Sequence, residues 1–257
     1  MNLSRRRALG VFLLGILPFA LHAEDDIRVR VNNFAPLYFL ENQQWLGLDI
    51  ELSTAIVKEA GFSIKYMEIP WSRAMMDLRN GDVDMILNFS RTPEREDFSH
   101  FIGPIRIAQR ALVVRKENVG LKISNLDELA EASRRTGILF GVLQRIRNDE
   151  AFDNRIANDP VFARQFESVA RSELLPKKVA HKHNLGFFQD VDYVIYHLKT
   201  DPDFQELALH SFRFPPEPIY YGVSKKLDPT KVKELEAAFH RLEANGVLTK
   251  IRNKWRQ

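Results

Sequence analysis

The sequence contains no cysteine among its 257 residues, and this absence excludes several kinds of site. Disulfide bonds, thiolate chemistry and zinc sites with cysteine ligands all need that residue. The first 23 residues contain three arginines and no acid, so basic and acidic residues number 34 each in the rest of the chain. With no positive surplus and no basic stripe, nucleic-acid binding has no electrostatic basis. Metal-ligand triads and glycine-rich phosphate loops are also missing, so we expect no metal, no cofactor and no nucleic-acid partner.

The N-terminus has the pattern of a secretory signal peptide. Arg5, Arg6 and Arg7 precede an uncharged apolar stretch over residues 8–21, and Ala23 supplies the small residue that a signal peptidase needs. The apolar stretch is too short for a good transmembrane helix, which disfavours an uncleaved anchor. We therefore expect export to the periplasm and cleavage after Ala23, with the export route left open.

The first part of the mature chain alternates strand and helix patterns. Because such alternation favours a parallel sheet covered by helices, we predict an α/β fold. Ligands of these sheets bind beyond the carboxyl ends of the strands, where the polar and aromatic residues of this region gather. The expected strands are 27–31, 63–69 and 83–89, the expected helices are 48–60 and 72–78, and the strand ends of interest are 32–34, 70–71 and 88–92.

The later part of the chain continues this alternation with weaker signals. A proline-rich segment at residues 215–218 indicates a stiff extended linker. The expected strands are 111–115, 138–143, 191–196 and 219–223, and the segments with helical patterns are 126–132, 148–167 and 232–244.

Several short motifs, in a fixed order, resemble those of family 3 periplasmic solute-binding proteins, the amino-acid-type binding components of ABC importers. Trp45 to Leu52 is similar to the family's "GfDvDla", and Leu78 to Ile86 to its "L-x-x-G-x-x-D-x-i". Thr92 to Arg95 matches "T-x-x-R", followed by "dFS" at residues 97–99. The closing motifs are similar at 220–226 and 246–255, whereas residues 120–214 match poorly.

This resemblance implies the periplasmic-binding-protein type II fold. That fold has two α/β lobes, each a sheet flanked by helices, joined by two crossover strands with the ligand between them. We expect residues 24–112 and 215–257 to form lobe one and residues 113–214 to form lobe two. The implied function is capture of a small polar, carboxylate-bearing, amino-acid-like solute by lobe closure, for an ABC permease in the inner membrane. We expect the protein to act as a monomer.

The resemblance also implies a carboxylate clamp in lobe one. Arg95 stands at the family's clamp position, and its planar guanidinium fits a carboxylate with two hydrogen bonds. Thr92 and Ser90 would complete the cradle, and the carbonyl of Asn88 would receive a ligand amine. The alternatives are a surface salt bridge for Arg95 and strand-end capping for the other three residues.

Aromatic and basic residues at the strand ends are further candidates. Phe34 and Trp71 stand where the family often holds its ligand with aromatic rings, although core packing is an alternative for both. Arg73 is a possible second anion contact, with a solvated helix face as the alternative.

Lobe two departs from the family pattern. Gln144 and Arg145 occupy a loop where the family often has glycine and threonine. His197 stands where we expect the family's acid for a ligand ammonium, and a neutral imidazole is a poor partner for that group. We therefore expect a ligand richer in carboxylate or other acceptor groups than a standard amino acid.

Two other functions share this fold. A few members of the family are dehydratases, which need a positioned acid or base in the cleft. The fold also reads ligands for membrane sensors, and the sequence does not separate delivery to a sensor from delivery to a permease. We expect no enzymatic activity, because the sequence contains no nucleophile–histidine–acid order.

Overall fold

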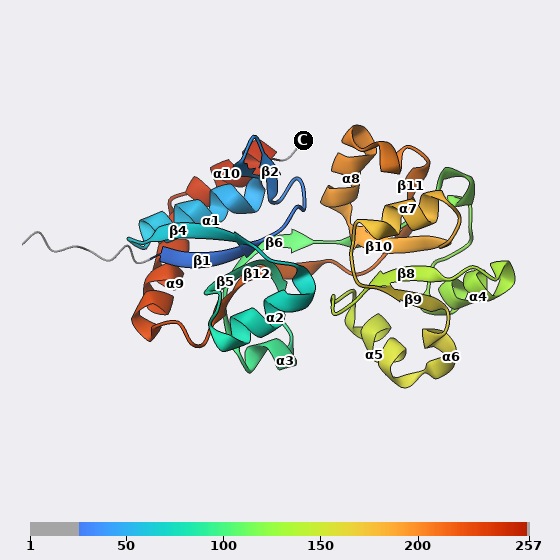
Figure 1. Ribbon diagram of the computed structural model, residues 1–257, viewed down its shortest axis with the longest axis horizontal. Helices are drawn as coiled ribbons and strands as arrows, with labels where there is room; N and C mark the ends of the chain where they lie inside the picture. The colour runs from blue at the N-terminus through green and yellow to red at the C-terminus, as the bar shows by residue number, and fades with distance from the viewer. Residues whose placement is uncertain (1–25, 256–257) are drawn as a thin grey trace, which may run out of the picture.

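The structure, a computed structural model, describes residues 26–255 and consists of two α/β lobes (Figure 1). Lobe one contains a five-stranded sheet in the order β4-β1-β5-β12-β6, and lobe two one in the order β11-β7-β10-β8-β9. The α/β fold class predicted from the sequence is confirmed. The expected signal peptide and its cleavage site lie outside the described residues. Within residues 26–255, no helix is long and apolar enough to cross a membrane.

Lobe one is built from two separate parts of the chain. A small hairpin, β2 (Phe39–Glu41) with β3 (Gln44–Leu46), projects from it. Its other elements are β1 (Asp26–Val31), α1 (Leu48–Glu59), β4 (Ser63–Glu68), α2 (Trp71–Asn80), β5 (Met85–Ser90), α3 (Pro93–Glu96), β6 (Ser99–Ala108), β12 (Glu217–Ser224), α9 (Pro229–Ala244) and α10 (Val247–Trp255).

Lobe two is formed by the segment between β6 and β12. Its strands are β7 (Arg110–Arg115), β8 (Phe140–Leu143), β9 (Phe166–Val169), β10 (Gly186–Asp190) and β11 (Leu207–Arg213). Its helices are α4 (Leu126–Thr136), α5 (Glu150–Asn158), α6 (Pro160–Ala163), α7 (Leu174–Ala180) and α8 (Val191–Thr200), with 3-10 turns at Lys116–Asn118 and Pro202–Phe204.

The start of helix α1 holds the turn that follows β1 in place. Its apolar face buries Leu52, Ile56 and Val57, which fixes the helix in the lobe-one core. The helix begins after Gly47, whose φ is 127° and whose added Cβ would lie 2.4 Å from the carbonyl oxygen of Leu37. Only glycine permits this approach. The turn after β1 is therefore held tightly against the start of α1.

The chain passes between the lobes twice (Figure 1). The first passage runs from β6 through Gln109 to β7, and the second runs from β11 through residues 214–216 to β12. Leu112 lies inside β7, where it pairs with Phe188 of β10. The expected lobe boundary at Leu112 therefore falls within a strand of the second sheet, and the change of sheet occurs at Gln109. On the return passage, the change of sheet occurs at residues 214–216.

The prediction of a strand over residues 191–196 is wrong, because these residues open helix α8. The strand lies one step earlier, in β10, where all five residues are buried. The Asp190 side chain accepts a hydrogen bond from the amide of Asp192 at 3.0 Å and caps the helix. An apolar run alone did not separate a buried strand from a buried helix face, since Tyr193 and Val194 are buried in either case.

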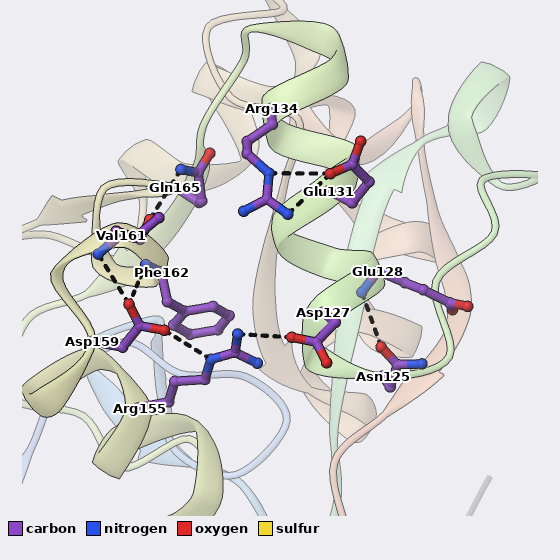
Figure 2. A network of polar contacts seen from close by, with 10 residues as sticks. All are labelled: Asn125, Asp127, Glu128, Glu131, Arg134, Arg155, Asp159, Val161, Phe162 and Gln165. Carbon is purple, nitrogen blue, oxygen red and sulfur yellow. Dashed lines mark hydrogen bonds and ion pairs between the residues drawn. The ribbon is translucent and has the colours of Figure 1, made fainter.

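A polar network joins three helices of lobe two (Figure 2). Arg155 of α5 reaches Asp127 of α4 at 2.7 Å and Asp159, the cap of α6, at 3.3 Å. Its guanidinium also lies 4.3 Å from the ring centre of Phe162. The helical pattern of residues 148–167 is thus split into α5 and α6, and Phe166 already begins β9.

Candidate ligand-binding site

A pocket lies between the two lobes, with a cavity volume of about 40 Å³. Both lobes contribute to its wall, and most of the lining groups lie at strand ends or in the loops that follow them. Lobe one contributes Arg30, Asn32, Phe34, Tyr38, Trp71, Asn88, Ser90 and Arg95, and lobe two contributes Arg110, Leu143, Ile146, Arg147, Ser172 and Gln189.

A wider groove of about 850 Å³ also lies between the lobes, lined in part by β6, α8 and α10. Its wall includes the exposed side chains of Ile107 and Ile195. The smaller pocket collects buried charged and aromatic groups, which are the groups that orient a small ligand. We therefore take the smaller pocket as the candidate site.

Arg95 is buried in the pocket wall, with 7% of its surface exposed. Its Nη1 donates a hydrogen bond to the carbonyl oxygen of Ser90 at 2.8 Å, and its guanidinium lies 4.4 Å from the ring centre of Phe89. Burial lowers the pKa of Arg95 to about 10, opposed by attraction from Glu217, so the group stays charged at neutral pH. A surface salt bridge, the alternative role for Arg95, is not seen among the described residues.

The hydroxyl and amide groups near Arg95 already have partners within the protein. Ser90 Oγ donates to Glu217 Oε1 at 3.0 Å, and Asn88 Oδ1 accepts from Arg106 Nη2 at 2.8 Å. Asn88 lies inside β5 and has a φ of 55°, a left-handed conformation that asparagine tolerates better than most residues. Thr92 does not line the pocket, because its hydroxyl accepts a hydrogen bond from the Arg95 amide and caps α3.

The two predicted aromatic residues both lie in the pocket wall. Trp71 begins α2, and its ring lies 5.3 Å from the guanidinium of Arg30 and 5.6 Å from that of Arg95. Phe34 follows β1 and stacks on Tyr193 of lobe two, with ring centres 4.6 Å apart. Phe34 therefore joins the lobes as well as lining the pocket.

Trp71 also bonds across the cleft. Its Nε1 donates to the carbonyl oxygen of Arg145 at 3.2 Å, and Arg145 Nη1 donates to the carbonyl oxygen of Ser72 at 3.0 Å. Arg145 has a φ of 58° in an exposed loop. Arg145 and its neighbour Gln144 thus lie outside the pocket lining, and Arg145 instead fastens lobe two to the start of α2.

Two further predicted residues lie away from the pocket. Arg73 is exposed and pairs with Asp77 one turn along α2, at 3.1 Å. His197 lies within α8, where its ring packs on Phe204 at 5.1 Å and its Nδ1 lies 3.0 Å from Asp201. Burial lowers the pKa of His197, against the opposing effect of Asp201.

The strand end that the sequence analysis expected next to His197 lies seven residues earlier, at an acidic residue. Asp190 ends β10 beside the pocket residue Gln189 and is 3% exposed. Its Oδ2 accepts a hydrogen bond from Arg106 Nη2 at 2.7 Å, and both side chains are buried. The strand predicted over residues 191–196 had placed this strand end beside His197.

Sequence reasoning missed most of the arginines that surround the pocket. Arg30 lies in the strand predicted over residues 27–31 but was not selected as a site residue, and it is 1% exposed. Strand β1 lies between β4 and β5, and helices cover both faces of this sheet. A charged residue near the carboxyl end of a central strand was the available signal. Arg110 and Arg147 carried no comparable signal.

Several known proteins with related sequences or structures are named as binding proteins. The arginine-binding extracellular protein ArtP of Bacillus subtilis is 22% identical over 226 residues, which cover 87% of this chain and 82% of that protein. The probable histidine-binding protein of Neisseria gonorrhoeae is 26% identical over 244 residues, covering 89% of this chain and 82% of that protein. An ancestral arginine-binding protein bound to arginine superposes with a TM-score of 0.76 at 20% identity, covering 92% of this chain and all of that one.

These likenesses extend over nearly the whole chain. The structural similarity confirms the expected periplasmic-binding-protein type II fold, with its two lobes on either side of a pocket. The sequence model of one protein family matches residues 27–257. The chain belongs to the bacterial extracellular solute-binding proteins, family 3.

Proposed function

We propose that this chain is the exported substrate-binding component of an ABC importer and captures a small carboxylate-bearing solute between its lobes. Arg95 carries the proposal. It is a buried guanidinium in an interlobe pocket, and no carboxylate among residues 26–255 forms an ion pair with it. An unpaired buried charge is costly, and a ligand carboxylate would offset that cost with two charge-assisted hydrogen bonds.

Binding would begin on lobe one, where Arg95 and Trp71 offer a charge and a flat ring. Lobe two would then close by rotation about the two passages between the sheets, at Gln109 and at residues 214–216. Closure would exclude water, which strengthens each charged hydrogen bond in the pocket. The closed form is the state that a membrane permease would select.

The pocket wall supports binding rather than chemistry. Among the described residues that line it, none is a carboxylate or a histidine, the groups that most often move protons in enzymes. The wall's one phenol, Tyr38, has its pKa raised by burial and stays protonated at neutral pH. A dehydratase would need an acid or base in contact with its substrate, and this wall offers arginines instead.

The test is a thermal-shift screen of residues 24–257, followed by isothermal titration calorimetry of every solute that raises the melting temperature. The panel contains amino acids, mono- and dicarboxylates, short peptides and polyamines. A ligand at 100 times its dissociation constant adds about 2.7 kcal/mol to the free energy of unfolding. Stabilisation by a carboxylate-bearing solute is the expected result. A panel in which no solute shifts the transition would overturn the proposed function.

We also propose that the signal peptide is removed after Ala23 and that the mature protein is a monomer in the periplasm. Expression of the full chain in a Gram-negative host, followed by mass spectrometry of the periplasmic fraction, gives the new N-terminus. The expected first residue is Glu24. Replacing the small residue, as in Ala23→Phe, should block cleavage and leave the longer species in the cell. A different N-terminus would contradict the assigned site.

A further inference from the structure

The pocket wall carries positive charge only. Its four guanidinium groups belong to Arg30, Arg95, Arg110 and Arg147, and none of the lining side chains is acidic. Of the four, only Arg147 forms ion pairs within the described chain, with Glu217 at 3.2 Å and Glu150 at 3.8 Å. Three arginines thus face the ligand space without a carboxylate of their own.

Arg30 offers the clearest unused donor. The residue is 1% exposed, and its Nη2 is buried with no hydrogen-bond partner among residues 26–255. Its Nε donates to the carbonyl oxygen of Ile69 at 2.7 Å, which fixes the guanidinium plane beside Trp71. A buried donor without a partner is costly, and such groups point to a ligand that completes the site.

Arg110 supplies a donor from lobe two. It begins β7 directly after the first passage between the lobes, and its side chain is half-buried. Asp190 and Glu217 attract it only through space, and no hydrogen bond of its guanidinium is seen within residues 26–255. The unpaired guanidiniums therefore come from both lobes and face one small cavity.

The carboxylate at the end of β10 already has a partner within the chain. Asp190 lies at the end of β10 next to the pocket, and the buried guanidinium of Arg106 holds it at 2.7 Å. Arg106 also donates to Asn88 and lies close enough to attract the buried carboxylate of Asp49. An arriving ammonium would meet no carboxylate in the pocket wall and would be repelled by the arginines.

From this arrangement we infer that the ligand is a compact dicarboxylate and that an amino group on it weakens binding. The inference rests on the proposed function and names the class of solute for that same pocket. One carboxylate would lie on Arg95 and the other between Arg30 and Arg110, so that closure places a lobe-two cation against a lobe-one ligand. The cavity of about 40 Å³ favours a short carbon chain.

Matched pairs of ligands test this directly. Isothermal titration calorimetry of residues 24–257 compares succinate with aspartate and glutarate with glutamate, because each pair differs by one amino group. We expect at least one diacid to bind 10-fold or more tightly than its amino partner, with no detectable binding of arginine or histidine. Tighter binding of the amino acid in both pairs, or binding of arginine, would overturn the inference and leave the proposed function standing. Absence of binding by every solute tested would overturn both.

Three variants then test which arginines bind the ligand's carboxylates and which one neutralises Asp190. Arg110→Gln should weaken diacid binding more than 10-fold, and Arg30→Lys should weaken it while keeping the charge, because the fixed plane is lost. Arg106→Gln keeps hydrogen bonding but frees the charge of Asp190, so the ratio of aspartate to succinate affinity should rise. Arg134→Gln is the control, since Arg134 is exposed on α4 and pairs with Glu131 (Figure 2), and neither residue lines the pocket.

The ratio of two affinities does not depend on the fraction of correctly folded protein, so a partly unstable Arg106 variant still gives a readable result. Circular dichroism spectra check the folding of the other variants. If Arg110→Gln binds the diacid as well as the unchanged protein does, the second carboxylate is not where we place it, and the inference fails.

Discussion

The two lobes each form part of the pocket wall, but the sequence predicted the lining residues of lobe one better than those of lobe two. Of the eight lining residues from lobe one, the sequence analysis selected five: Phe34, Trp71, Asn88, Ser90 and Arg95. Two other selections from lobe one, Thr92 and Arg73, do not line the pocket. For lobe two it selected Gln144, Arg145 and His197, and none of these lines the pocket. Groups that directly follow regular strands can be placed by sheet logic. Groups in irregular loops take their positions from tertiary contacts that a single sequence does not display.

The cores of the lobes differ as well. The residues around β1 and α1 are mainly aliphatic, with Val29, Leu52 and Ile56 fully buried. Lobe two instead holds a cluster of phenylalanines from four strands, two helices and the passage after β11: Phe140, Phe152, Phe162, Phe166, Phe188, Phe212 and Phe214. Several of these rings pack edge to face, an arrangement that adds to the energy gained from burying their area.

The largest expected effect breaks this aromatic cluster. Phe152 is 1% exposed, and its ring centre lies 5.0 Å from that of Phe166 and 5.4 Å from that of Phe188. Phe152→Ala should lower the free energy of unfolding by about 3–5 kcal/mol, because it leaves a cavity among rigid rings. Urea denaturation followed by circular dichroism measures this loss. Val161→Ala, at an exposed position of the same lobe, should change stability by less than about 0.5 kcal/mol.

The second prediction concerns the carboxylate clamp of lobe one. Arg95→Ala should weaken binding of the carboxylate ligand by about 2–5 kcal/mol, since the ligand charge would be buried without a partner. Calorimetry with the tightest ligand found gives the difference. Arg91→Ala is the matched control, because Arg91 is exposed and pairs with Glu96 on the surface. Equal losses for the two variants would show that the clamp is misplaced.

The third prediction uses pH to test the buried charge of Asp49, which lies in lobe one and is attracted by Arg106. Burial raises the pKa of Asp49 to about 6, opposed by attraction from Arg106. In the unfolded chain the pKa is about 3.9, so between pH 4 and pH 6 the folded state binds the extra proton. The contribution of Asp49 to the free energy of unfolding therefore falls as the pH rises through this window and is constant above it.

Comparison of the unchanged protein with Asp49→Asn isolates this contribution, because other titrating groups cancel in the difference. Urea denaturation at pH 4, 5, 6 and 7 should show the two proteins diverging by less than about 3 kcal/mol in total, with the unchanged protein losing relative stability toward pH 6. A relative gain over the same window would contradict the prediction.

The smallest expected effect concerns the fastening between the lobes. Arg145→Ala removes one exposed hydrogen bond to the Ser72 carbonyl, and should weaken ligand binding by about 1 kcal/mol or less. Small-angle scattering of the ligand-free protein should show a larger average radius for this variant. Arg73→Ala is the control, because Arg73 pairs within its own helix. A large loss of affinity for Arg145→Ala would show that this loop, and not Arg110, makes the main contribution of lobe two to ligand binding.

Strand and helix patterns predicted the fold where elements were regular. Helix α1 was placed within a residue because Leu52 and Ile56 repeat at helical spacing and Gly61 follows its end. Helix α8 was misassigned because residues 191–196 are apolar on adjacent positions, and only the cap at Asp190 distinguishes helix from strand. Arg30 shows the corresponding limit for the site. Its burial depends on which strands flank β1 and which helices cover the sheet, and both are properties of the assembled lobe.

The position of Trp71 has a practical consequence. Its indole lies beside two guanidinium groups and bonds to a carbonyl of the opposite lobe, so its surroundings change whenever the lobes separate. The other two tryptophans, Trp45 and Trp255, belong to lobe one and lie outside the pocket wall. With both replaced by phenylalanine, the intrinsic fluorescence of the remaining indole would report opening and closing in stopped-flow experiments. The protein thus carries its own optical probe of the motion, and no added dye is needed.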